Sequence, residues 1–201
     1  MKSTYKTSIL ATLLASSITG VIAESLESSL DSGFSQLEQA VPGKFNLDAR
    51  LRYEAFDLQS TPANDRSGSS LRVRYGYTTT NFNGFTAMVE GETLTRVGGE
   101  VDDIHPLDEL GDGTDLNQLW LQYKDADFGH VKVGRQIYSL DDHRFIGHVG
   151  WRQNIQTFDA ATAEYSGIEK LSIKPFYLAE QHGVNGTHNE LNAWGLNANY
   201  S

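Results

Sequence analysis

The sequence predicts an all-β protein, an antiparallel transmembrane β-barrel with about eight strands present in the chain. Three observations predict it. Apolar and polar residues alternate in several segments from Gly43 onward, short and long connections alternate between these segments, and aromatic residues cluster near the segment ends. Only 39% of the 201 residues are hydrophobic, which suits strands with one apolar and one wetted face.

The N-terminus predicts export from the cytoplasm. Lys2 and Lys6 give a positive start, an apolar stretch follows over residues 8–22, and Ala23 supplies a small residue for cleavage. We therefore expect residues 1–23 to be a signal peptide. The alternative for this stretch is a short buried helix.

Residues 24–42 predict a periplasmic lead-in to the barrel. Apolar residues such as Leu30, Phe34 and Leu37 recur at roughly helical spacing, and Pro42 ends the pattern. We expect a short amphipathic helix or a disordered segment here, without chemistry of its own.

Residues 43–201 predict the N-terminal part of the barrel. In the first strand the apolar side chains alternate with charged or amide ones, and this period of two recurs along the chain. Pro175 weakens the seventh strand, and the inward faces of the sixth and seventh remain ambiguous. The expected strands are 45–54, 71–78, 85–92, 118–123, 131–134, 158–165, 171–179 and 193–200.

The connections differ in length in a regular order. Short turns at one end of the strands and long loops at the other are typical of outer-membrane barrels. The expected short turns are 80–84, 124–129 and 166–170, and the expected long loops are 59–68, 95–115, 140–156 and 181–190. A soluble β-sandwich or a lipocalin-like barrel is the alternative fold.

The last predicted strand ends at the C-terminus with Tyr200 and Ser201. An eight-stranded barrel has an interior filled by side chains and leaves little room for a channel. We therefore expect a fragment of a larger barrel, with a small closed barrel as the alternative.

Several segments resemble one known family. They are Leu71-Arg72-Val73-Arg74-Tyr75-Gly76-Tyr77, Phe82-Asn83-Gly84-Phe85, Leu119-Trp120-Leu121-Gln122-Tyr123, Val133-Gly134-Arg135-Gln136 and Gly150-Trp151-Arg152-Gln153-Asn154. In order and spacing they resemble the alginate-export-like outer-membrane porins of Gram-negative bacteria, over about residues 43–201. The resemblance implies a larger barrel in the outer membrane, and export of an anionic polysaccharide through a basic lumen.

The polar sets of the strands predict the pore lining. If the apolar sets face lipid, the alternate side chains face water, and charges of both signs meet there. Such charges orient and select solutes, or they only neutralise one another and keep the wall wet. The expected pore-lining residues are Arg50, Arg52, Arg72, Arg74, Glu90, Glu92 and Lys132.

The loop at 140–156 is the predicted constriction. It is rich in charged and aromatic residues, and arginine presents a fixed fork of donors to anionic oxygens. The alternative is a latch, in which the same charges hold the loop to the wall. The expected constriction residues are Asp141, Asp142, His143, Arg144, Trp151, Arg152 and Gln153.

The remaining patterns argue against other functions. The net charge of -10 disfavours nucleic-acid binding, and the absence of cysteine excludes thiolate metal sites. No serine stands in a recognisable nucleophile context, so we expect no enzyme and no cofactor. Asp108, Asp112 and Asp115 could bind calcium, although their spacing does not match an EF-hand; a solvated acidic loop is the other interpretation.

The sequence therefore predicts an outer-membrane porin for passive diffusion of small hydrophilic solutes, anionic ones included. The alternative is a small closed barrel with a surface-binding or structural role. The expected partners are outer-membrane lipid and the solutes, and the sequence leaves a homo-oligomer open.

Overall fold

The computed structural model describes residues 18–56, 66–97 and 113–200. One helix precedes eight strands in this part of the chain. The elements are α1 (Ile18–Ala40), β1 (Gly43–Phe56), β2 (Arg66–Thr79), β3 (Phe85–Arg96), β4 (Gly113–Asp125), β5 (Gly129–Gln136), β6 (Thr157–Ile168), β7 (Leu171–His182) and β8 (His188–Tyr200).

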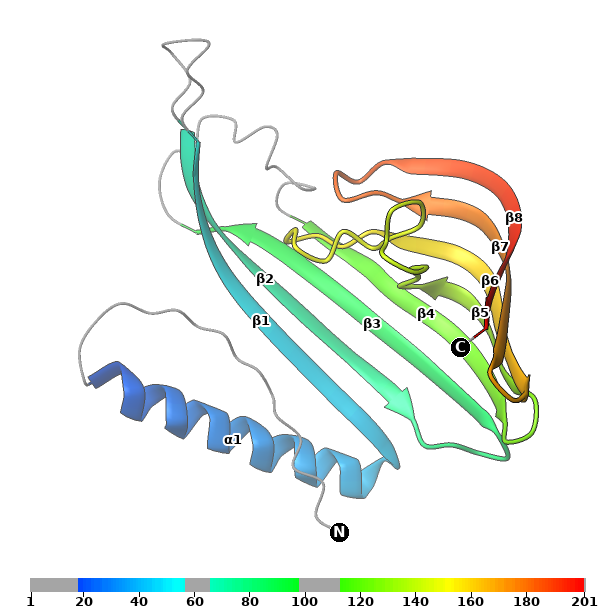
Figure 1. The fold of residues 1–201 in the computed structure, drawn as a ribbon. Coiled ribbons are helices and arrows are strands. Elements are labelled where there is room, and N and C mark those ends of the chain that lie inside the picture. The colour runs from blue at the N-terminus through cyan, green and yellow to red at the C-terminus, as the bar shows by residue number, and fades with distance from the viewer. Residues whose placement is uncertain (1–17, 57–65, 98–112, 201) are drawn as a thin grey trace.

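The strands form one antiparallel sheet in sequence order, β1 to β8. Each strand pairs with the next one along the chain, and β1 does not pair with β8 in the described structure. The sheet is bent into an open trough with one concave side (Figure 1). The all-β prediction is confirmed, and the sheet is not closed.

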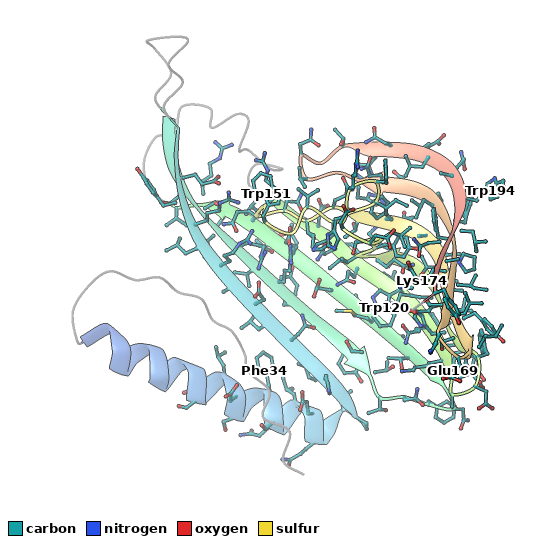
Figure 2. The ribbon with its side chains drawn as sticks, viewed as in Figure 1. Phe34, Trp120, Trp151, Glu169, Lys174 and Trp194 are labelled. Carbon is teal, nitrogen blue, oxygen red and sulfur yellow. The ribbon has the colours of Figure 1, made fainter. Side chains whose placement is uncertain are left out.

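The sheet exposes apolar side chains and buries polar ones, which is the reverse of the pattern in a water-soluble protein. Large apolar side chains are exposed on the convex face, and Trp194 on β8, which is 81% exposed, projects away from the trough (Figure 2). Charged and amide side chains are buried on the other face: Glu90 is 6% exposed and Gln136 only 1%. Soluble domains bury apolar and expose charged groups, so this arrangement fits a wall between lipid and water.

The two strands whose inward faces were ambiguous in the sequence carry apolar side chains on the concave face as well as on the convex one. Phe158 and Ala160 of β6 and Leu178 of β7 form a small buried cluster. The opposite set of these strands, including Ala161 and Tyr177, pairs across the convex face. Alternation alone could not assign these faces because both sets contain apolar residues.

The pairing of the strands shifts register at two places toward the end of the sheet that bears the loop 137–156. Glu90 pairs with Gln118 but Gly91 pairs with Leu116, which leaves Asn117 as an extra residue on β4. A second shift lies between Leu178 and Glu180 on β7. Bulges of this kind change which side chains face inward beyond them.

The strand ends that border residues 57–65, residues 97–112 and the loop 137–156 lie at one end of the sheet, and the short connections 80–84, 126–128 and 169–170 lie at the other. The predicted long loop 181–190 is wrong. β7 continues to His182 and β8 begins at His188, because a backbone hydrogen bond of 2.8 Å from Gly183 to Thr187 closes a tight turn.

Helix α1 lies beside β1 (Figure 1). Phe34 of the helix stacks on Phe45 of β1, with 6.4 Å between the ring centroids. The helix runs across the position between Ala23 and Glu24, so cleavage there stays a prediction. Among the described residues, no helix combines the length and apolar character needed to span a membrane.

Candidate functional site

The concave wall of the trough is lined by paired charges. Arg72 of β2 forms an ion pair with Asp48 of β1, and Arg74 forms one with Glu92 of β3. These partners lie on adjacent strands in the register of the sheet, which is why alternation brings them together. The wall is polar and wetted, yet most of its charge is neutralised locally.

Glu90 is the centre of a second polar cluster on this wall. Its carboxylate accepts hydrogen bonds from Asn117 at 2.6 Å, from Gln118 at 3.0 Å and from Asn46 at 3.0 Å. The bulge at Asn117 places two neighbouring amide side chains on the same carboxylate. A buried carboxylate needs such donors to remain stable without water.

The loop 137–156 lies on the concave side of the sheet (Figure 1). It connects β5 to β6, but its tip reaches β1 and β2, which are about 100 residues earlier in the chain. Gln153 is the main contact at that tip. Its side-chain oxygen accepts a hydrogen bond of 2.6 Å from Arg50, and its amide group donates one of 3.0 Å to the carbonyl of Ser70.

Four arginines of β1 and β2 donate to backbone carbonyls of the loop tip. Arg50 bonds the carbonyl of Arg152, and Arg52 bonds that of Trp151 at 2.9 Å. Arg72 and Arg74 each lie 3.5 Å from the carbonyl oxygen of Gln153. The arginine side chains predicted to line the pore therefore hold the loop tip against β1 and β2.

Trp151 is the most prominent side chain of the loop tip. It is 63% exposed, and Figure 2 places it over the upper part of the trough. The guanidinium of Arg152 lies 4.3 Å from the centre of its ring, and that of Arg52 lies 5.8 Å away. An exposed indole flanked by two guanidinium groups can stack on a flat apolar face, while Arg52 is itself ion-paired with Glu54.

The other end of the loop packs on the apolar cluster of β6 and β7. Tyr138 and Ile146 contact this cluster, and the Tyr138 ring lies 5.8 Å from the Phe176 ring. Burial, together with the charges of Asp141 and Glu164, raises the pKa of Tyr138 to about 12. Its hydroxyl is buried without a hydrogen-bond partner among the described residues.

His148 lies in the middle of the loop, with its ring 4.9 Å from that of His143. Burial lowers its pKa, and the nearby His143 and Arg74 lower it further. Its Nδ1 atom is buried and has no hydrogen-bond partner in the described part of the chain. The loop is therefore built around a histidine that favours its neutral form.

The remaining predicted residues lie apart from the tip. Lys132 of β5 sits 4.5 Å above the Trp120 ring on the concave wall. Asp141 accepts a hydrogen bond of 2.9 Å from Asn197 of β8. The Asp142 carboxylate caps the backbone of Arg144, whose guanidinium packs on Phe145 at 5.3 Å.

Of the three calcium candidates, Asp108 and Asp112 fall outside the described residues. Asp115 is an exposed residue of β4, paired with Glu92. Sequence reasoning missed Asp48 and Ser70, because neither has a local signal that separates a loop contact from an ordinary strand residue.

One known family matches the sheet from β1 into β7, together with the loop 137–156. Residues 41–179 match the family described as alginate export. The chain belongs to the alginate export family. This is a transport family of outer-membrane β-barrels and not an enzyme family, in agreement with the all-β sheet. No curated protein and no solved structure matches this chain.

Proposed function

We propose that the protein forms part of the wall of an outer-membrane pore that admits small, hydrophilic, negatively charged solutes by passive diffusion. The observation that carries this proposal is the loop 137–156, held on the polar side of a sheet whose opposite side is apolar. A loop held inside a wetted trough narrows the passage without closing it.

The chemistry of the loop tip supports anionic solutes. Trp151 presents an exposed ring flanked by Arg52 and Arg152, and Arg144 is exposed further along the loop. Arginine recognises carboxylates through a planar fork, and an indole stacks on the apolar face of a sugar. Alginate, for which the family is named, is an anionic polysaccharide, so it shares the negative charge of these solutes but not their small size.

Ion selectivity tests the proposal. The protein is reconstituted into planar bilayers, and the reversal potential is measured in a potassium chloride gradient. We expect conducting events that favour chloride, and a loss of this preference in Arg144→Ala/Arg152→Ala. The matched control is Arg144→Lys/Arg152→Lys, which keeps the charge. Absence of conductance, or equal selectivity in the alanine variant, would contradict the proposal.

A pore in the outer membrane also requires that the sheet close on itself into a barrel. β1 and β8 each have one edge that pairs with no described strand, and unpaired backbone groups are not tolerated in lipid. We therefore propose that these strands belong to a larger barrel. The small closed barrel would instead require β1 to pair with β8.

Cysteine crosslinking separates the two barrels, since the chain contains no cysteine of its own. Ala49 on β1 and Ala198 on β8 are replaced by cysteine, and the membrane-inserted protein is oxidised. In a larger barrel the two strands are far apart, and we expect no crosslink within one chain. Efficient crosslinking would support the small barrel and a surface-binding role. A cysteine pair on Ala49 and Val73, which are paired neighbours, serves as the positive control.

A further inference from the structure

Three side chains of metal-ligand type meet where β7 turns into β8. His182 is paired directly with His188 across the two strands, and Glu180 precedes His182 by two residues on the same face. One nitrogen of each histidine and one carboxylate oxygen of Glu180 all lie within 4.8 Å of one another. The tight turn between Gly183 and Thr187 fixes this juxtaposition.

The carboxylate of Glu180 faces both histidines. Its Oε1 atom lies 3.1 Å from Nδ1 of His188, and its Oε2 atom lies 4.0 Å from Nε2 of His182. The two imidazole rings meet edge to face, with 4.6 Å between their centroids. Two neutral imidazoles and a carboxylate form a donor set that suits zinc and its neighbours in the first transition row.

His182 also has the outer support that metal-binding histidines usually have. Its Nε2 atom lies 3.0 Å from Asp159, and Asp159 is held in turn by two hydrogen bonds from Arg135, of 2.9 and 3.1 Å. A metal-binding histidine commonly donates its second N–H to a carboxylate, which orients the ring. Nε2, which faces Asp159, is then the supporting nitrogen and zinc would bind Nδ1, so the 4.0 Å approach of Nε2 to Glu180 is not itself a ligand distance. The other nitrogen, Nδ1, is buried and lacks a hydrogen-bond partner among the described residues.

Room for an ion lies beside the two histidines, in a cavity that Glu180 does not line. A small cavity is lined by both histidines together with Asn117, Arg135 and Thr157. It lies where β4 extends beyond the end of β5, since Gly113 to Gln118 have no partner on β5. An ion in this cavity would meet the histidines from β7 and β8.

We propose that Glu180, His182 and His188 bind a zinc ion, with at least one coordination position left for water or an anionic oxygen. Ligand atoms around tetrahedral zinc are about 3.4 Å apart, given bonds of about 2.1 Å. The two ligand atoms that lie farthest apart must therefore move closer together by about 1 Å or somewhat more on binding. His188 can supply this movement, because its side chain is 59% exposed and therefore not fixed by packing.

The register places this site on the convex face of the sheet. Arg135, Asp159 and Glu180 are paired in a row across β5, β6 and β7. The next row on the same face contains Val133, Ala161 and Tyr177, an apolar row. The zinc site therefore lies on the loop side of the apolar surface, where it links the last two strands. It does not depend on the pore function proposed above.

Zinc binding to the purified full chain in detergent tests the site. Equilibrium dialysis against zinc, followed by metal analysis, gives stoichiometry and affinity, and cobalt as a probe reports coordination through its visible spectrum. We expect one zinc per chain, and a loss of affinity of at least tenfold in His188→Ala and in Glu180→Gln. Asp159→Asn, which affects only the support of His182, should cost about 10–100-fold.

Matched controls make the test specific. His130→Ala removes a histidine at the opposite end of β5 and should leave affinity unchanged, while His143→Ala tests the other histidine pair. His188 is exposed, so its replacement removes no packed side chain, and circular dichroism of each variant checks that the fold is kept. Absence of stoichiometric zinc, retention of affinity in His188→Ala, or loss only in His143→Ala would overturn the proposal.

Discussion

The amide group of Gln153 donates to both the carbonyl oxygen and the hydroxyl of Ser70, at 3.0 and 2.9 Å, and so joins residues that are 83 positions apart. Together with the bond from Arg50, these contacts make Gln153 the main side-chain attachment of the loop tip to the wall. The side chain of Gln153 is almost completely buried.

Replacement of Gln153 by alanine is expected to release the loop tip. Several hydrogen bonds are lost, each worth about 1 kcal/mol, so the free energy of unfolding should fall by about 2–3 kcal/mol. Bilayer recordings should show a larger and noisier conductance because the loop moves within the passage. Gln122→Ala on β4, away from the loop tip, is the control; an equal effect there would contradict the role of Gln153.

The ion pair between Arg74 and Glu92 is more deeply buried than the pair between Arg72 and Asp48. Glu92→Gln leaves the arginine without its counter-charge, and we expect a loss of about 3 kcal/mol in urea unfolding. Asp48→Asn, which affects the more exposed partner of Arg72, should cost less than about 1 kcal/mol. The double variant Arg74→Gln/Glu92→Gln should recover part of the loss, and strict additivity would argue against coupling.

Removal of the buried hydroxyl of Tyr138 is expected to leave stability unchanged or to increase it, in contrast to the losses above. Because it has no hydrogen-bond partner in the described structure, Tyr138→Phe removes a desolvated polar group while keeping the ring. We expect thermal stability to stay equal or to rise, by up to about 1 kcal/mol, whereas Tyr138→Ala should cost about 3 kcal/mol. A clear loss in the phenylalanine variant would show that the hydroxyl is bonded.

The lowered pKa of His148 predicts an acid-sensitive loop. The folded protein holds this histidine neutral, so its contribution to stability is present above the ordinary pKa of about 6.5 and is lost as the pH falls through the lowered value. Thermal unfolding between pH 8 and 5 should therefore show a smaller acid-induced drop in His148→Gln than in the parent. Parallel curves would contradict this expectation.

Gly134 permits close pairing of β4 and β5. Its φ angle is 120°, and a Cβ atom there would lie 2.2 Å from the carbonyl oxygen of Leu119. Gly134→Ala should destabilise the sheet by at least about 2 kcal/mol or prevent assembly, measured as the heat-modifiable fraction in gel electrophoresis. Gly113→Ala, where a Cβ atom meets nothing within 4 Å, should assemble normally.

Strand alternation predicted most of the wall correctly, for a physical reason. Side chains such as Leu51 and Val133 are exposed on the convex face because a two-residue period assigns faces without any long-range information. The same rule did not assign the faces of β6, where Phe158 lies under the loop on the concave side. It also did not locate the tight turn after His182, because polar residues continue through both strand ends.

The loop contacts were beyond sequence reasoning. Arg50 and Gln153 are 103 residues apart, and nothing local in either segment indicates the other. The arginines of β1 and β2 were expected to face solutes, whereas they contact carbonyls and carboxylates of the protein. The His182 and His188 juxtaposition depends on the exact end of β7, which alternation leaves uncertain by several residues.

The large sequence separation between the loop tip and the arginines of β1 and β2 that bind it also has a consequence for assembly. The tip of 137–156 binds side chains from the first two strands, across sequence distances of 79 to 103 residues. Contacts this distant form late, since the intervening strands must be in register before the ends can meet. We therefore expect the strands to pair before the loop tip attaches to β1 and β2, so that a form caught during assembly would have its loop released from the concave face.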